Sequence, residues 1–98
     1  MHATPVSIVC LIKAKEQTRQ QVRDELRQLA ALTRQEAGNL CYDLHVARTD
    51  DSLFVLYENW RDQAALDSHM DQPYFKDFIG KAAGLLERPV DITLCTKI

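Results

Sequence analysis

Apolar residues recur with a two-residue period in four stretches of the chain, and this pattern predicts four β-strands. The stretches are residues 5–14 (PVSIVCLIKA), 40–47 (LCYDLHVA), 53–60 (LFVLYENW) and 90–98 (VDITLCTKI). The first and third strands carry apolar side chains on both faces, which indicates central positions in a sheet. The fourth carries them on one face only, which is typical of an edge strand.

Between the strands the apolar period changes to that of an α-helix. The clearest helix runs from Thr18 to about Ala37 and is predicted to bury Val22, Leu26, Leu29, Ala30 and Thr33. Gly38-Asn39 should end it, because both residues tolerate the left-handed conformation that closes a helix. A short helix is expected after the N-cap residue Asp62, and a last helix begins at Pro73. Their predicted inward side chains are Leu66, His69 and Met70, then Phe75, Phe78, Ile79, Ala82 and Leu86.

The element order βαββ(αα)β predicts a ferredoxin-like α+β sandwich, in which helices cover one face of a single antiparallel sheet. The short polar turn at residues 49–52 (TDDS) makes the second and third strands a hairpin. In this topology the first and third strands are central and the other two are edges. Because one core fits a chain of this length, residues 1–98 are expected to form a single domain.

The face of the sheet without helices should expose a group of apolar side chains, either Val9, Leu11, Leu53, Val55 and Tyr57 or the residues that alternate with them on the opposite face. A monomer seldom exposes a contiguous apolar patch larger than about 300–600 Å². Burying such a patch at roughly 25 cal/mol per Å² would contribute several kcal/mol. We therefore expect a symmetric homodimer packed sheet to sheet.

The charge pattern gives no reason to expect a nucleic acid or a membrane as partner. The net charge is −2, and basic residues have acidic neighbours, as in Arg23-Asp24-Glu25, which is typical of a solvated helix face. No apolar stretch approaches the roughly 20 residues that span a bilayer, and the N-terminal segment lacks the pattern of a signal peptide. The expected location is the cytoplasm.

The three cysteines, Cys10, Cys41 and Cys95, are widely spaced within predicted strands. We expect them to be small buried hydrophobic residues in a reducing compartment. Their spacing matches no metal-binding motif, and the chain has no Gly-rich phosphate loop. We therefore expect neither a metal nor a bound cofactor.

Polar and aromatic side chains gather in residues 53–78, so a functional site is expected there. Glu58 lies among apolar neighbours and should bond either to His69, a backbone amide or a substrate, or instead anchor a helix N-terminus. His69 points inward, and a histidine can exchange a proton at neutral pH, although a plain core histidine is the alternative. His45 is expected at the surface, and His2 in the N-terminal tail.

Four aromatic residues could form a slot for a flat ring: Tyr42, Trp60, Tyr74 and Phe75. At these spacings they are as readily explained as core. The cluster as a whole therefore points to a ligand more strongly than any member does.

The segments Tyr57-Glu58-Asn59-Trp60, Ala64-Ala65, His69 and Pro73-Tyr74-Phe75 resemble the E-x-W…A…H…P-x-F pattern of antibiotic biosynthesis monooxygenase (ABM) domains. The resemblance covers essentially the whole chain and is strongest to small quinol-monooxygenase-like members. It implies a dimeric α+β barrel with one cavity per subunit between helices and sheet. Family members include cofactor-independent monooxygenases that act on quinols and polycyclic phenols, isomerases of a phosphorylated autoinducer, and haem-degrading enzymes.

The haem-degrading branch does not match residue by residue. The first strand (VSIVCLIK) lacks that branch's Asn, His69 occupies its Trp position, and Ile79 falls where its haem-ligating His should be. The resemblance therefore favours a cofactor-independent monooxygenase acting on a small aromatic substrate and O₂. In such an enzyme His69, oriented by Glu58, would remove a phenolic proton, and a dry aromatic cavity would protect the reactive intermediate.

Two other classes of function remain open from the sequence. The protein could be an isomerase or a hydrolytic helper for a small polar metabolite, with Glu58 and His69 as its catalytic residues. It could also be a non-catalytic small-molecule-binding dimer, since this fold hosts many functions. Dependence of turnover on O₂ separates these classes from a monooxygenase.

Overall fold

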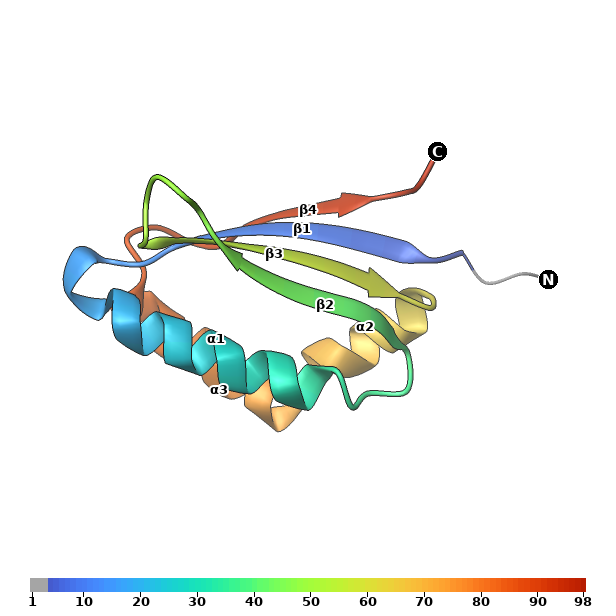
Figure 1. Ribbon diagram of the computed structural model, residues 1–98. Helices are drawn as coiled ribbons and strands as arrows, with labels where there is room; N and C mark the ends of the chain where they lie inside the picture. The colour runs from blue at the N-terminus through green and yellow to red at the C-terminus, as the bar shows by residue number, and fades with distance from the viewer. Residues whose placement is uncertain (1–3) are drawn as a thin grey trace.

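The computed structural model describes residues 4–98, so His2 lies outside the described part of the chain. Within it, four strands form one antiparallel sheet in the order β2-β3-β1-β4 (Figure 1). The strands are β1 (Val6–Lys13), β2 (Asn39–Val46), β3 (Leu53–Trp60) and β4 (Asp91–Cys95). As predicted, β1 and β3 are central and β2 and β4 are edges, which confirms the ferredoxin-like α+β fold.

Three α-helices lie on one face of the sheet and leave the other face without helices (Figure 1). They are α1 (Arg19–Thr33), which follows the short 3₁₀-helix η1 (Glu16–Thr18), α2 (Gln63–Met70) and α3 (Pro73–Leu85). Asp62 caps α2 as predicted, because its Oδ1 accepts a hydrogen bond from the Ala65 amide at 2.8 Å. Pro73 occupies the first turn of α3, where a missing N–H leaves no hydrogen bond unmade.

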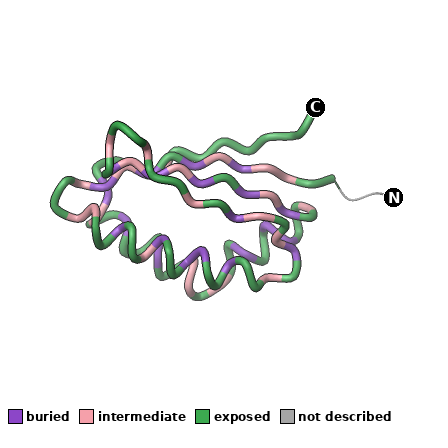
Figure 2. The backbone as a smooth tube through the Cα atoms, viewed as in Figure 1, coloured by how far each residue is buried: buried purple, intermediate pink, exposed green. Residues whose placement is uncertain are grey.

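The core lies between the helices and the inner face of the sheet, where the buried parts of both layers meet (Figure 2). All five predicted inward positions of α1 are buried. β3 supplies Phe54, Leu56 and Trp60 to the same core, and β1 supplies Ile8 and Ile12. The alternation of buried and exposed residues along β1 and β3 fixes which side chains face the helices.

The prediction for the end of α1 was wrong. The helix ends at Thr33, four residues before Ala37, and Gly38 does not adopt a positive φ. Gly38 is instead needed for close packing, because a Cβ built on it would lie 2.3 Å from the Cβ of Ala65. Glycine at this position lets the segment after α1 approach α2 closely.

β4 is shorter than predicted and more exposed, since it covers Asp91–Cys95 and all five residues are exposed (Figure 2). Ile92 and Leu94 pair with Cys10 and Ile8 of β1, so they lie on the inner face of the sheet. They remain 52% and 56% exposed, because the three helices do not cover this edge. An apolar margin therefore stays open beside the core.

Four side chains are more exposed than the sequence pattern predicts. Ile79 of α3 was expected to be buried but is 45% exposed, since it borders the open side near β4. Met70, the last residue of α2, is exposed as well. Of the cysteines only Cys10 is buried; Cys41 is half-buried and Cys95 on β4 is exposed.

Candidate active site

A cavity of about 70 Å³ lies between the helices and the inner face of the sheet. Most of its lining is apolar, including Ile8, Leu26 and Phe78. Its polar and aromatic lining residues are Cys10, Tyr42, Glu58, His69 and Phe75. The fold thus brings together, around one cavity, residues from β1, β2, β3, α2 and α3.

His69 presents one ring nitrogen to this cavity and uses the other to hold its position. The residue is 2% exposed, and its Nδ1 lies 2.8 Å from the Oε2 of Glu36. A carboxylate can only accept, so Nδ1 donates to it, and in the neutral imidazole this tautomer leaves the lone pair on Nε2. Within residues 4–98 Nε2 has no hydrogen-bond partner. The arrangement leaves Nε2 free to accept a proton from a molecule in the cavity.

One carboxylate oxygen of Glu36 accepts two hydrogen bonds. Besides the contact with His69, its Oε2 accepts a hydrogen bond from the Tyr74 hydroxyl at 2.5 Å. Burial, followed by the interaction with Glu36, raises the pKa of Tyr74, so this hydroxyl stays protonated and continues to donate. The Glu36 side chain is only 12% exposed and therefore forms a fixed support for the imidazole.

Glu36 was missed in the sequence. It lies just beyond the end of α1, three residues after the buried Thr33, where the apolar stripe of the helix would next turn inward. An acidic residue at that position on an otherwise apolar stripe was the available signal. Its partners lie 33 and 38 residues further along the chain, so the pairing itself could not be read from local spacing.

Glu58 is buried in the same cavity but bonds to groups other than His69. Its Oε1 accepts a hydrogen bond from Trp60 Nε1 at 2.9 Å, and its Oε2 accepts one from Cys10 Sγ at 3.6 Å. Burial raises the pKa of Glu58, and the bonds from Trp60 and Cys10 oppose part of that rise. Glu58 thus lines the cavity as a second titratable group, while the expected role of orienting the imidazole falls to Glu36.

The thiol of Cys10 stays protonated beside Glu58. Burial, together with the nearby carboxylate, raises the pKa of Cys10 to about 12. Burial and the nearby Glu58 also raise the pKa of Tyr42, which is 3% exposed. Cys10 and Tyr42 are therefore donors at neutral pH and not nucleophiles.

Aromatic rings surround the imidazole on several sides. The ring centroid of His69 lies 4.6 Å from Trp60, 4.9 Å from Phe75 and 5.9 Å from Tyr42. Phe75 and Tyr42 line the cavity, whereas Trp60 and Tyr74 lie outside its lining and contact His69 and Glu36 respectively. The predicted aromatic slot is thus divided into two residues that face the cavity and two that support the histidine.

A wider hollow of about 480 Å³ adjoins the cavity between α3 and the segment before β4. Ile79 and Val90 line both spaces, so they form the boundary between them. Small-molecule sites typically measure about 300–1,000 Å³, and the outer hollow falls in that range. A shift of these two apolar side chains would join the hollow to the polar groups inside.

Two features are absent from the part of the chain that runs from residue 4 onward. In it, no group of three or more His, Cys, Asp or Glu side chains is arranged to hold a metal ion. None of its helices combines the length and apolar character required to cross a membrane.

Comparison with known proteins gives one consistent result. The sequence model of the family described as "Antibiotic biosynthesis monooxygenase" matches residues 5–81. The chain is 35% identical over 81 residues to "Putative monooxygenase YcnE" of Bacillus subtilis, covering 83% of this chain and 85% of the relative. It is 31% identical over 91 residues to "Putative monooxygenase Rv0793" of Mycobacterium tuberculosis, covering 93% and 89%. The crystal structure of PA3566 from Pseudomonas aeruginosa superimposes with a TM-score of 0.93 and 37% identity, covering 100% of this chain and 98% of that one.

Proposed function

Because the chain belongs to the antibiotic biosynthesis monooxygenase family, we propose that it is a cofactor-independent monooxygenase that oxidises a small quinol or polycyclic phenol with O₂. The observation that carries the proposal is the free Nε2 of His69, directed at an apolar cavity and fixed by Glu36. The names of the two relatives support a monooxygenase-type reaction. The substrate class is what the resemblance to the family's cofactor-independent members implies, and the apolar and aromatic lining of the cavity is compatible with it.

The first step assigned to this site is removal of a phenolic proton by His69 Nε2. The proton moves onto the imidazole, and the carboxylate of Glu36 stabilises the resulting imidazolium. Tyr74 holds Glu36 in place through its hydroxyl. The product of the step is an electron-rich phenolate in a site with little water, and this phenolate supplies the electrons that reduce O₂.

The oxygen atoms and electrons then balance without an added reductant. The phenolate carbon forms a C–O bond to dioxygen, and the peroxide takes up a proton. Cleavage of its O–O bond, with loss of the hydrogen on the same carbon as a proton, leaves one oxygen on the organic product as a carbonyl and releases the other as water. Overall, a quinol and O₂ give a hydroxyquinone and water. Glu58, whose pKa is raised by burial, is the group we assign to protonate the departing oxygen.

The substrate is proposed to approach through the hollow between α3 and the segment before β4. The inner cavity of about 70 Å³ is too small for an aromatic ring system, whereas the outer hollow of about 480 Å³ is large enough. Ile79 and Val90 separate the two and would have to move. Phe75 and Tyr42 would then contact the flat face or edge of the ring.

A homodimer through the outer face of the sheet belongs to the same proposal. On this face Leu11 and Tyr57 are 37% and 40% exposed, and Val9 and Val55 lie beside them in paired registers of β1 and β3. We expect wild-type protein to sediment as a dimer at micromolar concentration and Leu11→Lys to sediment as a monomer. Leu32→Lys, which changes an exposed leucine of α1, should stay dimeric. A wild-type monomer under these conditions would contradict the sheet-to-sheet contact.

Oxygen consumption by the purified, metal-free protein with hydroquinones and naphthols tests the proposed reaction. We expect consumption above the rate of autoxidation, lost in His69→Ala and retained in His45→Ala, which changes an exposed histidine. Isotopically heavy O₂ should label the organic product and the released water equally. Turnover that survives in His69→Ala would remove this histidine from the mechanism. Conversion of a substrate without O₂ would instead support an isomerase.

A further inference from the structure

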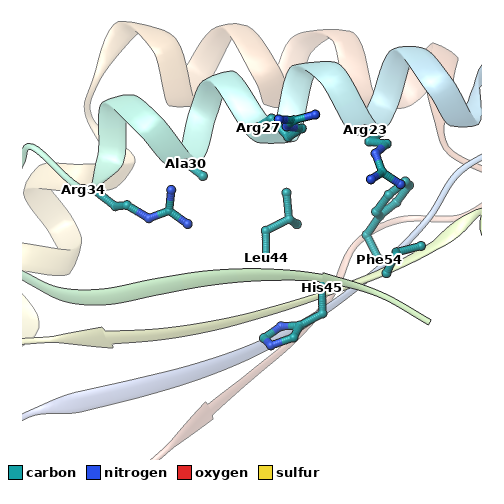
Figure 3. Close-up of a pocket in the computed structure, with 8 residues that line it drawn as sticks. Arg23, Arg27, Ala30, Arg34, Leu44, His45 and Phe54 are labelled. Atoms are coloured by element: carbon teal, nitrogen blue, oxygen red, sulfur yellow. The ribbon is translucent and has the colours of Figure 1, made fainter. Parts of the chain in front are cut away.

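A stripe of arginines borders a second hollow, between α1 and the edge strand β2, away from the cavity that holds His69. Arg23 and Arg27 lie on α1 and Arg34 caps its C-terminus; with Ala30 they are spaced by three or four residues, so they share one side of the helix. In Figure 3 Arg23 and Arg34 extend from the helix toward β2 and β3. The hollow measures about 400 Å³. We refer to it as the arginine groove.

Two of these guanidinium groups lack partners. Within residues 4–98 neither Arg23 nor Arg27 makes a hydrogen bond or an ion pair, in contrast to Arg19, which contacts Glu16 and Asp51. No carboxylate lines the groove. The positive charge along this side of α1 is therefore not neutralised locally.

The acidic neighbours of Arg23 in the sequence do not change this result. Asp24 accepts a hydrogen bond from Gln20, and Glu25 forms an ion pair with Lys81 of α3. Arg23 and Asp24 are exposed and Glu25 is half-buried, as expected for a solvated helix face. The acidic side chains contact Gln20 and Lys81, whereas Arg23 and Arg27 line the arginine groove.

The third arginine is held in position. Nε and Nη2 of Arg34 both donate to the backbone carbonyl of Tyr42, at 3.1 and 2.8 Å. The guanidinium therefore closes one end of the groove while Nη1 has no hydrogen-bond partner within residues 4–98. A fixed guanidinium loses less freedom on binding a carboxylate than a mobile one does.

The floor of the groove is apolar. Ala30 and Phe54 are buried beneath it, Leu44 is half-buried, and Val46 is exposed at its side. In Figure 3 the side chain of Leu44 points from β2 toward α1, whereas the ring of His45 points to the opposite face of the sheet. The polar contribution of the lining therefore comes from the arginines.

We propose that the arginine groove binds a small amphipathic anion, in which a carboxylate is attached to a flat apolar body. The guanidinium groups would bind the carboxylate, and the apolar floor would contact the body. The volume of about 400 Å³ accommodates one or two fused rings. The groove shares no lining residue with the cavity that contains His69 and Glu58, so it is a separate site.

Titration with 2-naphthoate and with its neutral analogue 2-naphthalenemethanol tests the proposal. Naphthoate should bind about tenfold more tightly or better, because only the anion forms charge-assisted hydrogen bonds with the guanidinium groups. The double variant Arg23→Gln/Arg27→Gln should lose this preference. Arg48→Gln/Arg61→Gln, which removes the same charge from exposed arginines outside the groove, should keep it.

Amide chemical-shift changes locate the bound probe. We expect them in residues 23–34 and 44–46 upon adding naphthoate. Equal affinity for the two probes, undiminished binding to Arg23→Gln/Arg27→Gln, or shift changes confined to the surroundings of His69 would each overturn the proposal. So would a change in sedimentation of the same variant without loss of naphthoate binding, since the groove would then serve contact with another chain.

Discussion

Replacing Glu36 by Gln tests whether this residue supports the candidate site. The substitution keeps the shape of the side chain but removes the charge that accepts from both His69 and Tyr74. A hydrogen bond to a charged group contributes about 1.5–3 kcal/mol and a neutral one about 0.5–1.5 kcal/mol. The loss is therefore about 1 kcal/mol for each bond and about 2 kcal/mol in total.

Urea unfolding followed by tryptophan fluorescence measures this loss directly. Trp60 is the only tryptophan in the chain and stacks near the His69 ring, so its emission reports on this region. A loss of about 2 kcal/mol corresponds to a melting temperature lower by about 8–16 °C in a domain of this size. Glu16→Gln is the matched control, because Glu16 pairs with Arg19 on the exposed surface and its replacement should change stability by less than about 0.5 kcal/mol.

A double-mutant cycle with Tyr74→Phe separates the two bonds. Without the tyrosine hydroxyl, Glu36→Gln can weaken only the bond with His69, so its cost should fall to about 1 kcal/mol. The same loss in both backgrounds would show that Tyr74 and Glu36 are not coupled. A loss below about 0.5 kcal/mol in the wild-type background would refute the view that Glu36 fixes the imidazole.

Three further predictions concern single positions. Gly38→Ala should destabilise the fold by about 1–3 kcal/mol, because the added Cβ would collide with Ala65. Gly80→Ala has open space around it and should instead stabilise α3 by up to about 1 kcal/mol. The midpoints of urea unfolding measure both changes. Asp62→Ala should cost about 1 kcal/mol through loss of the α2 cap, and Asp62→Asn, measured by thermal melting, should recover most of it. Burial raises the pKa of Glu58 in the native protein above the ordinary glutamate value of about 4.3. At a pH between these two pKa values, Glu58 is ionised in the unfolded chain but still protonated in the native protein. The free energy of unfolding therefore decreases as pH rises through this window. In Glu58→Gln, urea titrations at several pH values should no longer show this decrease. The same pH dependence in wild type and Glu58→Gln would contradict the prediction.

The topology could be predicted from the sequence because it depends on local periodicity. β1 and β3 carry apolar side chains on both of their faces, a pattern typical of central strands. The structure places both strands in the centre of the sheet. The caps of α2 and α3 were predictable for a similar reason, since Asp62 and Pro73 act within one helical turn of their own positions.

The end of α1 depended on packing between distant segments and was therefore missed. Gly38 was predicted to close the helix because glycine tolerates a left-handed conformation. The structure gives a different reason for glycine at this position, namely its close contact with Ala65 on α2. Glycine permits a left-handed backbone and also allows close packing, so its presence in a sequence does not show which of these two properties the fold uses. Cys95 was missed for another reason: it pairs with Ser7 on the outer face of the sheet, the face that the helices leave uncovered, so its side chain is exposed.

The candidate site shows how a residue can be identified while its partner is not. His69 was predicted to face inward because Leu66 shares its side of α2, and it is buried in the structure. Its expected partner Glu58 is also buried in the cavity, but it is occupied by Trp60 and Cys10, two donors already present in the core. Glu36 reaches the imidazole only because α1 ends early and the following turn brings the carboxylate across to α2. Under the proposed mechanism the two carboxylates have different tasks: Glu36 would stabilise a protonated imidazole, and Glu58, with its raised pKa, would hold a proton near the substrate.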